Sequence, residues 1–332
     1  MKMNSSKKMF FTMMIMSTMM VMSSENWISM WMGLEINMMM FIPLMMKSKN
    51  KKSPESKMMY FLIQSMSSMV FLMTIIANPM MMYSEMTSEM MKMIMVASIA
   101  MKMGAAPFHM WFTEIITKMS WNNSMILMTW QKIAPMSIMT MIYQEKMITM
   151  IAIISTMIGA IGGINQTSIQ KIMAFSSINH MGWMLIILNS ESEIWLKYLM
   201  LYSIMVIMIM KSMEKKSIQF MNQIQSICKN KMEKMNIMIM MMSLGGMPPM
   251  MGFLPKWMAI QSMMNKKMML IMMIMIMMSM ITLYYYLRMM TPMMIINTES
   301  NKIMIKKSKN EENKMIIMLN LMLPAMMIMN MF

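Results

Sequence analysis

Eleven apolar runs, most of them about 20 residues long, constrain this chain more than any other feature. A transmembrane α-helix needs about 20 predominantly apolar residues to cross the hydrocarbon core of a bilayer. Short polar clusters separate the runs, as connecting loops would. The runs cover residues 9–22, 26–46, 58–77, 90–117, 123–144, 147–164, 169–189, 194–213, 235–264, 266–288 and 315–332. The pattern predicts an all-α polytopic membrane protein with about 11 transmembrane helices.

The amino-acid composition supports a membrane location. Of the 332 residues, 58% are hydrophobic and 13% are charged, whereas a soluble globular domain carries about 25% charged residues. Half that fraction leaves too little polar surface to cover a water-soluble domain. No internal repeat of 20–50 residues is visible. We expect residues 1–332 to form a single transmembrane domain.

Two of the runs, 90–117 and 235–264, are longer than one straight span needs, and each contains a break. The first break is at Pro107 and the second, rich in glycine, is at Pro248. Proline removes an intrahelical hydrogen bond and clashes with the preceding turn. In hydrocarbon the freed backbone groups need partners, so broken helices face the protein interior or a wet cavity. The sequence therefore predicts two broken helices, which point to an ion pathway.

The distribution of lysine and arginine predicts the topology. With eleven spans, the N-terminus and the even-numbered loops share one face, which carries 22 of the 30 basic residues, whereas the opposite face carries 5. Positively charged loops stay on the inner side of a membrane, so we expect the N-terminus inside. The net charge of +16 is then explained by the basic residues on one membrane face, and not by a groove that binds the phosphates of a nucleic acid. No nucleic-acid partner is expected.

This chain lacks the residues that several kinds of cofactor require. Cys228 is the single cysteine and His109 and His180 are the two histidines, whereas an iron–sulfur cluster needs about four thiolates. The spacings CxxC, HExxH and GxGxxG are also absent. We therefore expect no metal, nucleotide or redox cofactor in this chain, and any redox chemistry that it serves to take place elsewhere.

Four ionisable residues lie well inside apolar runs: Glu35, Lys102, Lys132 and Lys256. A charge at the centre of a span costs about 2.5–3.5 kcal/mol, so such residues persist when they are paired, hydrated or needed. A lysine near the end of a span can extend to the headgroups, most readily Lys256. Glu35 is too short for this and needs a partner, by its charge a lysine. Coupled glutamate and lysine side chains predict a proton relay.

The two histidines are weaker candidates for the same relay. His109 follows Pro107 by two residues, and His180 follows Ser176 and Ser177. Histidine changes its charge near neutral pH, which suits proton transfer. The alternative is a hydrogen-bonded residue in helix packing, for which the two serines would provide partners to His180.

Codon usage points to a mitochondrial gene. Methionine accounts for 82 residues, aspartate is absent and Arg288 is the single arginine. Residues with AT-rich codons are abundant, and an excess of methionine over leucine is expected where ATA encodes methionine. We interpret methionine as flexible apolar filler and assign no metal site to it. No cleavable presequence is evident, so we expect a multi-pass protein of the mitochondrial inner membrane with its N-terminus in the matrix.

Five segments of the chain resemble, in matching order, the subunit 2 family of mitochondrial NADH:ubiquinone oxidoreductase (complex I). They are residues 31–37 (WMGLEIN), 101–111 (MKMGAAPFHMW), 127–135 (LMTWQKIAP), 174–183 (AFSSINHMGW) and 243–257 (SLGGMPPMMGFLPKW). The resemblance covers nearly the whole chain, and the AT-rich composition is similar to that of an insect mitochondrial gene.

The resemblance implies an antiporter-like subunit of the membrane arm, with eleven spans and inverted repeats that each contain a broken helix. It also implies that Glu35, Lys102, Lys132 and Lys256 lie along a hydrated central axis and carry protons. NADH, FMN, iron–sulfur clusters and ubiquinone would act in other subunits. The partners implied are the other membrane-arm subunits, including neighbouring antiporter-like subunits, and membrane lipids.

Two other functions fit the same charges. A stand-alone secondary cation/proton antiporter needs the same broken helices and lysines, although the eleven-span form and the mitochondrial codon usage favour complex I. A structural spacer of the membrane arm would hold its charges as buried pairs. Removing one partner of such a buried pair lowers the stability by about 3–5 kcal/mol. For a structural spacer, the loss of one charge would therefore impair assembly as well as catalysis.

Overall fold

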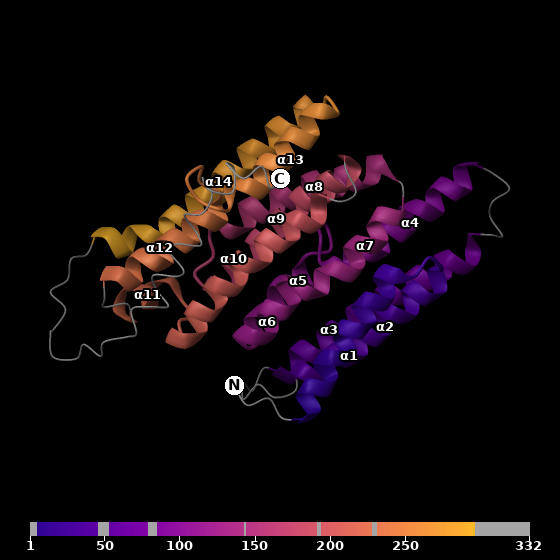
Figure 1. The fold of residues 1–332 in the computed structure, drawn as a ribbon, viewed down its shortest axis with the longest axis horizontal. Coiled ribbons are helices and arrows are strands. Elements are labelled where there is room, and N and C mark those ends of the chain that lie inside the picture. Colours follow the sequence, from indigo (N-terminus) through magenta and orange to yellow (C-terminus); the bar gives the residue numbers. More distant parts are fainter. Residues whose placement is uncertain are drawn as a thin grey trace. The chain divides into compact units, whose positions relative to one another are not determined.

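The structure, a computed structural model, describes residues 5–45, 53–78, 85–142, 144–190, 194–227 and 231–295. Within these ranges the chain is built from helices (Figure 1), and an isolated antiparallel bridge joins Ser168 to Phe220. The predicted all-α class is confirmed. The predicted span 315–332 and Cys228 lie outside the described residues.

The chain forms two compact units, Met1–Ser155 and Thr156–Phe332, with the boundary inside one helix. The first unit contains α1 (Ser5–Ser23), α2 (Trp27–Met45), α3 (Ser53–Ala77), α4 (Glu85–Met103), α5 (Met110–Lys118), α6 (Trp121–Met128), the 3₁₀ turn η1 (Trp130–Lys132), α7 (Ile133–Met141) and the first part of α8 (Glu145–Gly163). α2 packs against both α1 and α3, and α7 packs against α1, α2 and α4. The side chains of Met14 and Phe41 are fully buried in this unit. A single domain over the whole chain stays a prediction.

The second unit contains the end of α8 and α9 (Ile169–Ser190), α10 (Ile194–Lys216), α11 (Met221–Ile227), α12 (Lys231–Gly245), α13 (Phe253–Asn265) and α14 (Met269–Ile295). α10 packs against α9, α12 and α13. In the most apolar stretch of each helix, the share of buried residues is 89% for α9 and 22% for α14. α9 is therefore surrounded by protein, whereas α14 leaves most of its apolar surface for the surroundings.

Six of the described helices are long and apolar enough to cross a membrane: Trp27–Met45, Pro54–Ala77, Glu145–Gly163, Ile169–Asn189, Ile194–Lys216 and Met269–Pro292. The chain is thus a multi-pass membrane protein, as predicted. Ten of the eleven apolar runs fall on helices or interrupted helices of the described residues. The short α11 was not predicted, because four of its seven residues are polar and it lies between two runs.

α4 ends in a glycine turn that interrupts the first broken helix. Gly104 has a φ of +69°, in the left-handed region that glycine adopts without a penalty from a β-carbon. Its N–H donates to the carbonyl of Met101 at 3.2 Å, and the N–H of Ala105 donates to Ala100 at 3.0 Å. This pair of bonds is the Schellman motif that commonly ends helices. Since α5 begins only after Pro107, the first predicted break is confirmed.

α12 ends in the same motif, and the second predicted break is confirmed as well. Gly246 has a φ of +80°, and its N–H donates to the carbonyl of Ser243 at 3.0 Å. The N–H of Met247 donates to Met242 at 3.3 Å. The chain returns to a helix, α13, only after Pro248 and the residues that follow it. Each unit therefore contains one helix that is interrupted at a glycine.

A third interruption lies in the run 123–144, which the sequence analysis treats as one span. The structure divides this run into α6, η1 and α7. Pro135 has no N–H, so the carbonyl of Gln131 has no α-helical partner. The chain instead takes a 3₁₀ turn, which ends at Lys132. Proline is tolerated in the first turn of α7 because N–H groups there have no intrahelical acceptor.

Candidate functional site

Lys102 and Lys132 line the same internal cavity in the first unit. Its volume is about 20 Å³, which is room for about one water molecule. The two side chains are 7% and 1% exposed, so the protein encloses both. The interruptions of the helices place them, because Lys102 lies two residues before Gly104 at the end of α4, and Lys132 ends the 3₁₀ turn before α7.

Three amide side chains give the cavity a polar lining: Asn37, Gln64 and Gln131. Gln131 Nε2 donates to Asn37 Oδ1 at 2.9 Å, and Gln64 Nε2 donates to the backbone carbonyl of Lys102 at 3.1 Å. Amides carry both donors and acceptors, so this lining suits a water molecule between the lysines. These three amides were not among the residues predicted from the sequence, although an uncharged polar residue inside an apolar run is a signal that identifies such positions.

Aromatic rings form part of the cavity wall. The Lys132 ammonium nitrogen lies 5.7 Å from the centre of the Phe112 ring, within the range of a cation–π interaction, which is worth about 2 kcal/mol when desolvated. Trp111 packs edge-to-face on Phe112 with ring centres 5.8 Å apart. The ring centres of Tyr60 and Trp111 are 6.1 Å apart. These rings stabilise a buried positive charge while keeping bulk water out.

Glu35 lies beside this cavity on α2 but does not line it. The side chain is partly buried, and its carboxylate interacts electrostatically with Lys102. The ion pairs found within the described residues, Lys118–Glu55 and Lys216–Glu233, do not include it. Glu35 was expected to have a lysine partner. Among the described residues it forms no direct ion pair, and it interacts electrostatically with Lys102.

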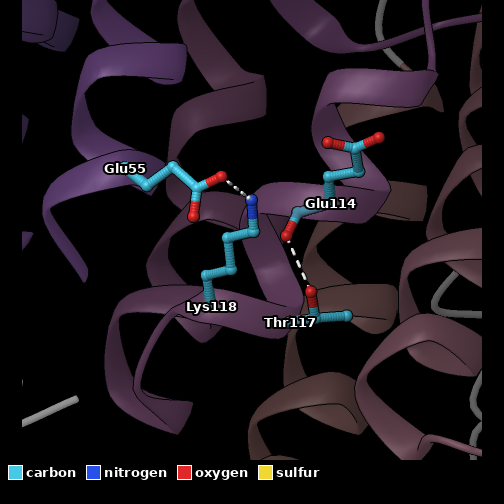
Figure 2. Close-up of polar contacts among 4 residues, drawn as sticks. All are labelled: Glu55, Glu114, Thr117 and Lys118. Atoms are coloured by element: carbon cyan, nitrogen blue, oxygen red, sulfur yellow. Dashed lines mark hydrogen bonds and ion pairs between the residues drawn. The ribbon is translucent and has the colours of Figure 1, made fainter. Parts of the chain in front are cut away.

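One of these ion pairs lies away from the cavity and provides a comparison. Lys118 Nζ is 2.9 Å from Glu55 Oε1, and the two side chains are 19% and 63% exposed. Figure 2 shows the pair joining the end of α5 to the start of α3, with Thr117 donating to the carbonyl of Glu114 at 2.7 Å nearby. An exposed pair of this kind contributes about 0.2–1 kcal/mol, so its charges are of little consequence for stability.

Lys256 lies in the second unit, at the other glycine break. Its side chain is buried, and Nζ donates to the carbonyl of Gly245, the last residue of α12, at 2.8 Å. The C-terminus of a helix carries a partial negative charge, which stabilises the ammonium group there. The lysine thus points into the break, so the alternative that it extends to the headgroups is not what the structure shows. Lys102 precedes its break, whereas Lys256 follows its own.

The two histidines have different surroundings. His180 is buried in the second unit, with Nδ1 2.8 Å from the Tyr198 hydroxyl and its ring centre 4.8 Å from that of Tyr202. His109 is partly buried, and its Nδ1 lies 3.1 Å from the carbonyl of Pro107. A carbonyl can only accept, so this His109 nitrogen donates the proton in that bond. His109 does not line the cavity, and the packing role proposed for His180 has a partner in Tyr198.

The described part of the chain is an all-helical membrane bundle with glycine-interrupted helices and buried lysines, and the chain belongs to a class of antiporter-type membrane subunits. The family model described as NADH:quinone oxidoreductase/Mrp antiporter, TM matches residues 24–282. NADH-ubiquinone oxidoreductase chain 2 of Anopheles gambiae is 42% identical over 265 residues, which are 78% of this chain and 77% of the relative. NADH-ubiquinone oxidoreductase chain 2 of Locusta migratoria is 42% identical over 268 residues, which are 79% of this chain and 78% of the relative. Our chain belongs to this family, the NADH-ubiquinone oxidoreductase chain 2 proteins.

Solved structures share the fold at low sequence identity. A chain of respiratory complex I from Thermus thermophilus superposes with a TM-score of 0.83 and 16% identity, over 97% of this chain and 78% of that one. A chain of the Mrp complex from Dietzia sp. DQ12-45-1b gives a TM-score of 0.74 and 14% identity, over 85% of this chain and 59% of that one. The fold is therefore shared with a chain of a respiratory complex I and with a chain of an Mrp complex.

Replacing Gln131 by leucine tests whether the amide lining stabilises the cavity. We expect Gln131→Leu to destabilise the protein by about 1–3 kcal/mol, since the buried Asn37 Oδ1 loses the donor that it has in the structure. The measurement is the thermal stability of the isolated assembly. The matched control is Gln144→Leu, whose hydrogen bond to Glu89 is longer, at 3.4 Å, and exposed, and which should change stability by less than about 0.5 kcal/mol. Equal stability of the two variants would contradict the role of the amides.

Proposed function

We propose that this chain is a core membrane-arm subunit of respiratory complex I in the mitochondrial inner membrane. It couples NADH oxidation and ubiquinone reduction, which take place in other subunits, to proton translocation. Membership of the NADH-ubiquinone oxidoreductase chain 2 family supports the complex. The observation that carries the coupling role is the small polar cavity that Lys102 and Lys132 share.

The cavity supports a proton transfer between the two lysines. An ammonium group of one lysine donates a proton to a water molecule in the cavity, and the water passes a proton to the neutral amine of the other. The amides of Gln64 and Gln131 orient the water. Because the carboxylate of Glu35 acts electrostatically on Lys102, a change in its charge alters how readily Lys102 holds its proton. Glu35 is thus the residue through which a neighbouring event reaches the relay.

The relay continues at Lys256 in the second unit. His109 in the first unit and His180 in the second are further candidates. A lysine bonded to a helix terminus can exchange its partner when a water molecule reaches the break. The assignment of all four charged residues to one pathway rests on the family resemblance and on their burial. Lys102, Lys132 and Lys256 are each less than 9% exposed.

The proposal also covers orientation, cofactors and partners. The N-terminus lies in the matrix, as the excess of lysine and arginine on one predicted face favours. NADH, FMN, iron–sulfur clusters and ubiquinone bind to other subunits, and no group of three or more potential metal ligands occurs within the described part of the chain. The partners are the other membrane-arm subunits, including antiporter-like ones, and membrane lipids.

The test of the assembly is native electrophoresis of mildly solubilised mitochondrial membranes, with an NADH-oxidation stain and mass spectrometry of the bands. We expect peptides of this chain in a very large, stained band. Peptides confined to a small, unstained band would overturn the proposal. That outcome would favour the stand-alone antiporter, for which a cation gradient imposed on vesicles should drive proton exchange without NADH.

A further inference from the structure

The single arginine of the chain lines a cleft that the proton relay does not use. Arg288 belongs to α14, and the cleft of about 700 Å³ lies between this helix and two loops of the second unit. Thr167 comes from the loop between α8 and α9, and Phe220 from the loop between α10 and α11. This volume lies within the range of small-molecule binding sites.

The backbone holds the two loops together. The N–H of Ile169 donates to the carbonyl of Gln219 at 3.0 Å, and the N–H of Met221 donates to the carbonyl of Thr167 at 3.1 Å. These bonds form the isolated bridge between Ser168 and Phe220. The two loops that border the cleft are therefore joined to each other by backbone hydrogen bonds.

The Arg288 guanidinium has more donors than acceptors in this structure. Nη2 donates to the carbonyl of Gln166 at 2.7 Å and lies 3.8 Å from the sulfur of Met221. Nε is buried and has no hydrogen-bond partner among the described residues, and the ion pairs found there do not include Arg288. A buried donor without an acceptor is unfavourable, and a guanidinium suits a phosphate, which offers several acceptor oxygens.

The position of Arg288 along α14 fits the level of lipid headgroups. Residues 268–287 contain no charged residue, and Lys266 and Lys267 precede them. From Met269 to Arg288 the helix rises about 29 Å, which is close to the roughly 30 Å of a hydrocarbon core. The basic residues at the two ends of this run thus lie near the two surfaces of the membrane.

A stripe of exposed side chains runs along α14 toward the cleft. It consists of Met273, Met277, Met280, Tyr284 and Leu287, all exposed. Their spacing of three or four residues places them on one helix face, and Thr291, which lines the cleft, continues it. An acyl chain could follow this stripe while its headgroup reaches Arg288.

We propose that this cleft binds an anionic phospholipid. Its phosphate accepts hydrogen bonds from the Arg288 guanidinium and from the side-chain amide of Asn222, which also lines the cleft. One acyl chain lies along the stripe of α14. A free phosphate ion offers the same acceptors but would leave the stripe uncovered. The continuity of the cleft with an apolar surface therefore favours the lipid.

The first test needs no variant. The intact assembly in mild detergent is incubated with a phosphatidylglycerol that carries a photoreactive group on an acyl chain, and labelled peptides are identified by mass spectrometry. We expect label on peptides containing residues 273–287, along the stripe where the acyl chain lies, competed by unlabelled phosphatidylglycerol but not by phosphatidylcholine. Absence of label from these peptides, or equal competition by both lipids, would overturn the proposal, and so would a cross-link that shows the cleft occupied by another protein.

Variants test the role of the guanidinium. In Arg288→Gln we expect phosphatidylglycerol to bind roughly tenfold or more weakly, since a charge-assisted hydrogen bond is lost. Arg288→Lys keeps the charge but not the planar fork, and it should bind with an intermediate affinity. The control Lys211→Gln removes an exposed charge from α10 and should bind as the natural protein does. Protection from thermal unfolding by inorganic phosphate alone, equal to that by phosphatidylglycerol, would show an anion site and overturn the lipid assignment.

Discussion

Lys102→Met is expected to lower proton pumping and the turnover coupled to it by roughly tenfold or more, while the complex still assembles. Methionine fills a volume similar to that of lysine but cannot carry a proton, so the cavity keeps its shape and loses one end of the transfer. Proton uptake by vesicles that contain the isolated complex, driven by NADH and a quinone, measures the effect. Native electrophoresis of the same membranes measures assembly.

This variant separates a relay from a structural spacer. Replacing a buried charge by an apolar side chain of similar volume is often neutral or stabilising when no strong partner is left behind. Glu35 makes no direct ion pair among the described residues, so it loses little when Lys102 becomes neutral. Normal assembly with impaired pumping supports the relay, whereas impaired assembly supports the spacer. A variant that pumps and turns over normally would show that Lys102 has no part in proton transfer.

Lys118→Met is the matched control for Lys102→Met. It removes a lysine from the helix that follows the same break, and the lost ion pair with Glu55 (Figure 2) contributes about 0.2–1 kcal/mol at most. We expect pumping and assembly close to those of the natural protein. A loss in Lys118→Met equal to that in Lys102→Met would show that any missing lysine on these helices impairs the protein.

Gly246→Ala is expected to impair function more than its small size suggests. A β-carbon at Gly246 would lie 2.8 Å from Cδ and 2.9 Å from Nζ of Lys256. The flexible end of Lys256 can move away from the new β-carbon. The hydrogen bond from Lys256 Nζ to the carbonyl of Gly245 is then lost. The φ of +80° adds about 1–2 kcal/mol of strain for any residue with a β-carbon. We therefore expect reduced pumping together with a modest loss of thermal stability.

Gly245→Ala is the control at the neighbouring position. A β-carbon there would have its nearest neighbour at 3.5 Å, on the ring of Tyr286, which is an ordinary contact. Alanine also favours the helix that this residue ends. We expect normal pumping and unchanged or slightly higher stability, measured by vesicle assays and thermal unfolding. If the two alanine variants behave alike, the bond between Lys256 and the end of α12 has no functional importance.

The fold was more predictable from the sequence than the site. The apolar runs identify membrane helices because the thickness of a bilayer sets their length. The breaks at Pro107 and Pro248 were also predictable, since glycine and proline act on the backbone locally. The interruption before Lys132 was missed, although Pro135 carried the same signal, because the run around it is no longer than a single span.

The sequence by itself determined the helical membrane class, the two broken helices and the presence of charges inside apolar runs, because each depends on residues close together in the chain. Only the tertiary structure decided which of these groups meet. It brought Gln131 to Asn37 across 94 positions of sequence and Gln64 to the carbonyl of Lys102 across 38. It also set Arg288 against the loop of Gln166, 122 positions away. Such contacts follow from the packing of whole helices, which no local pattern specifies.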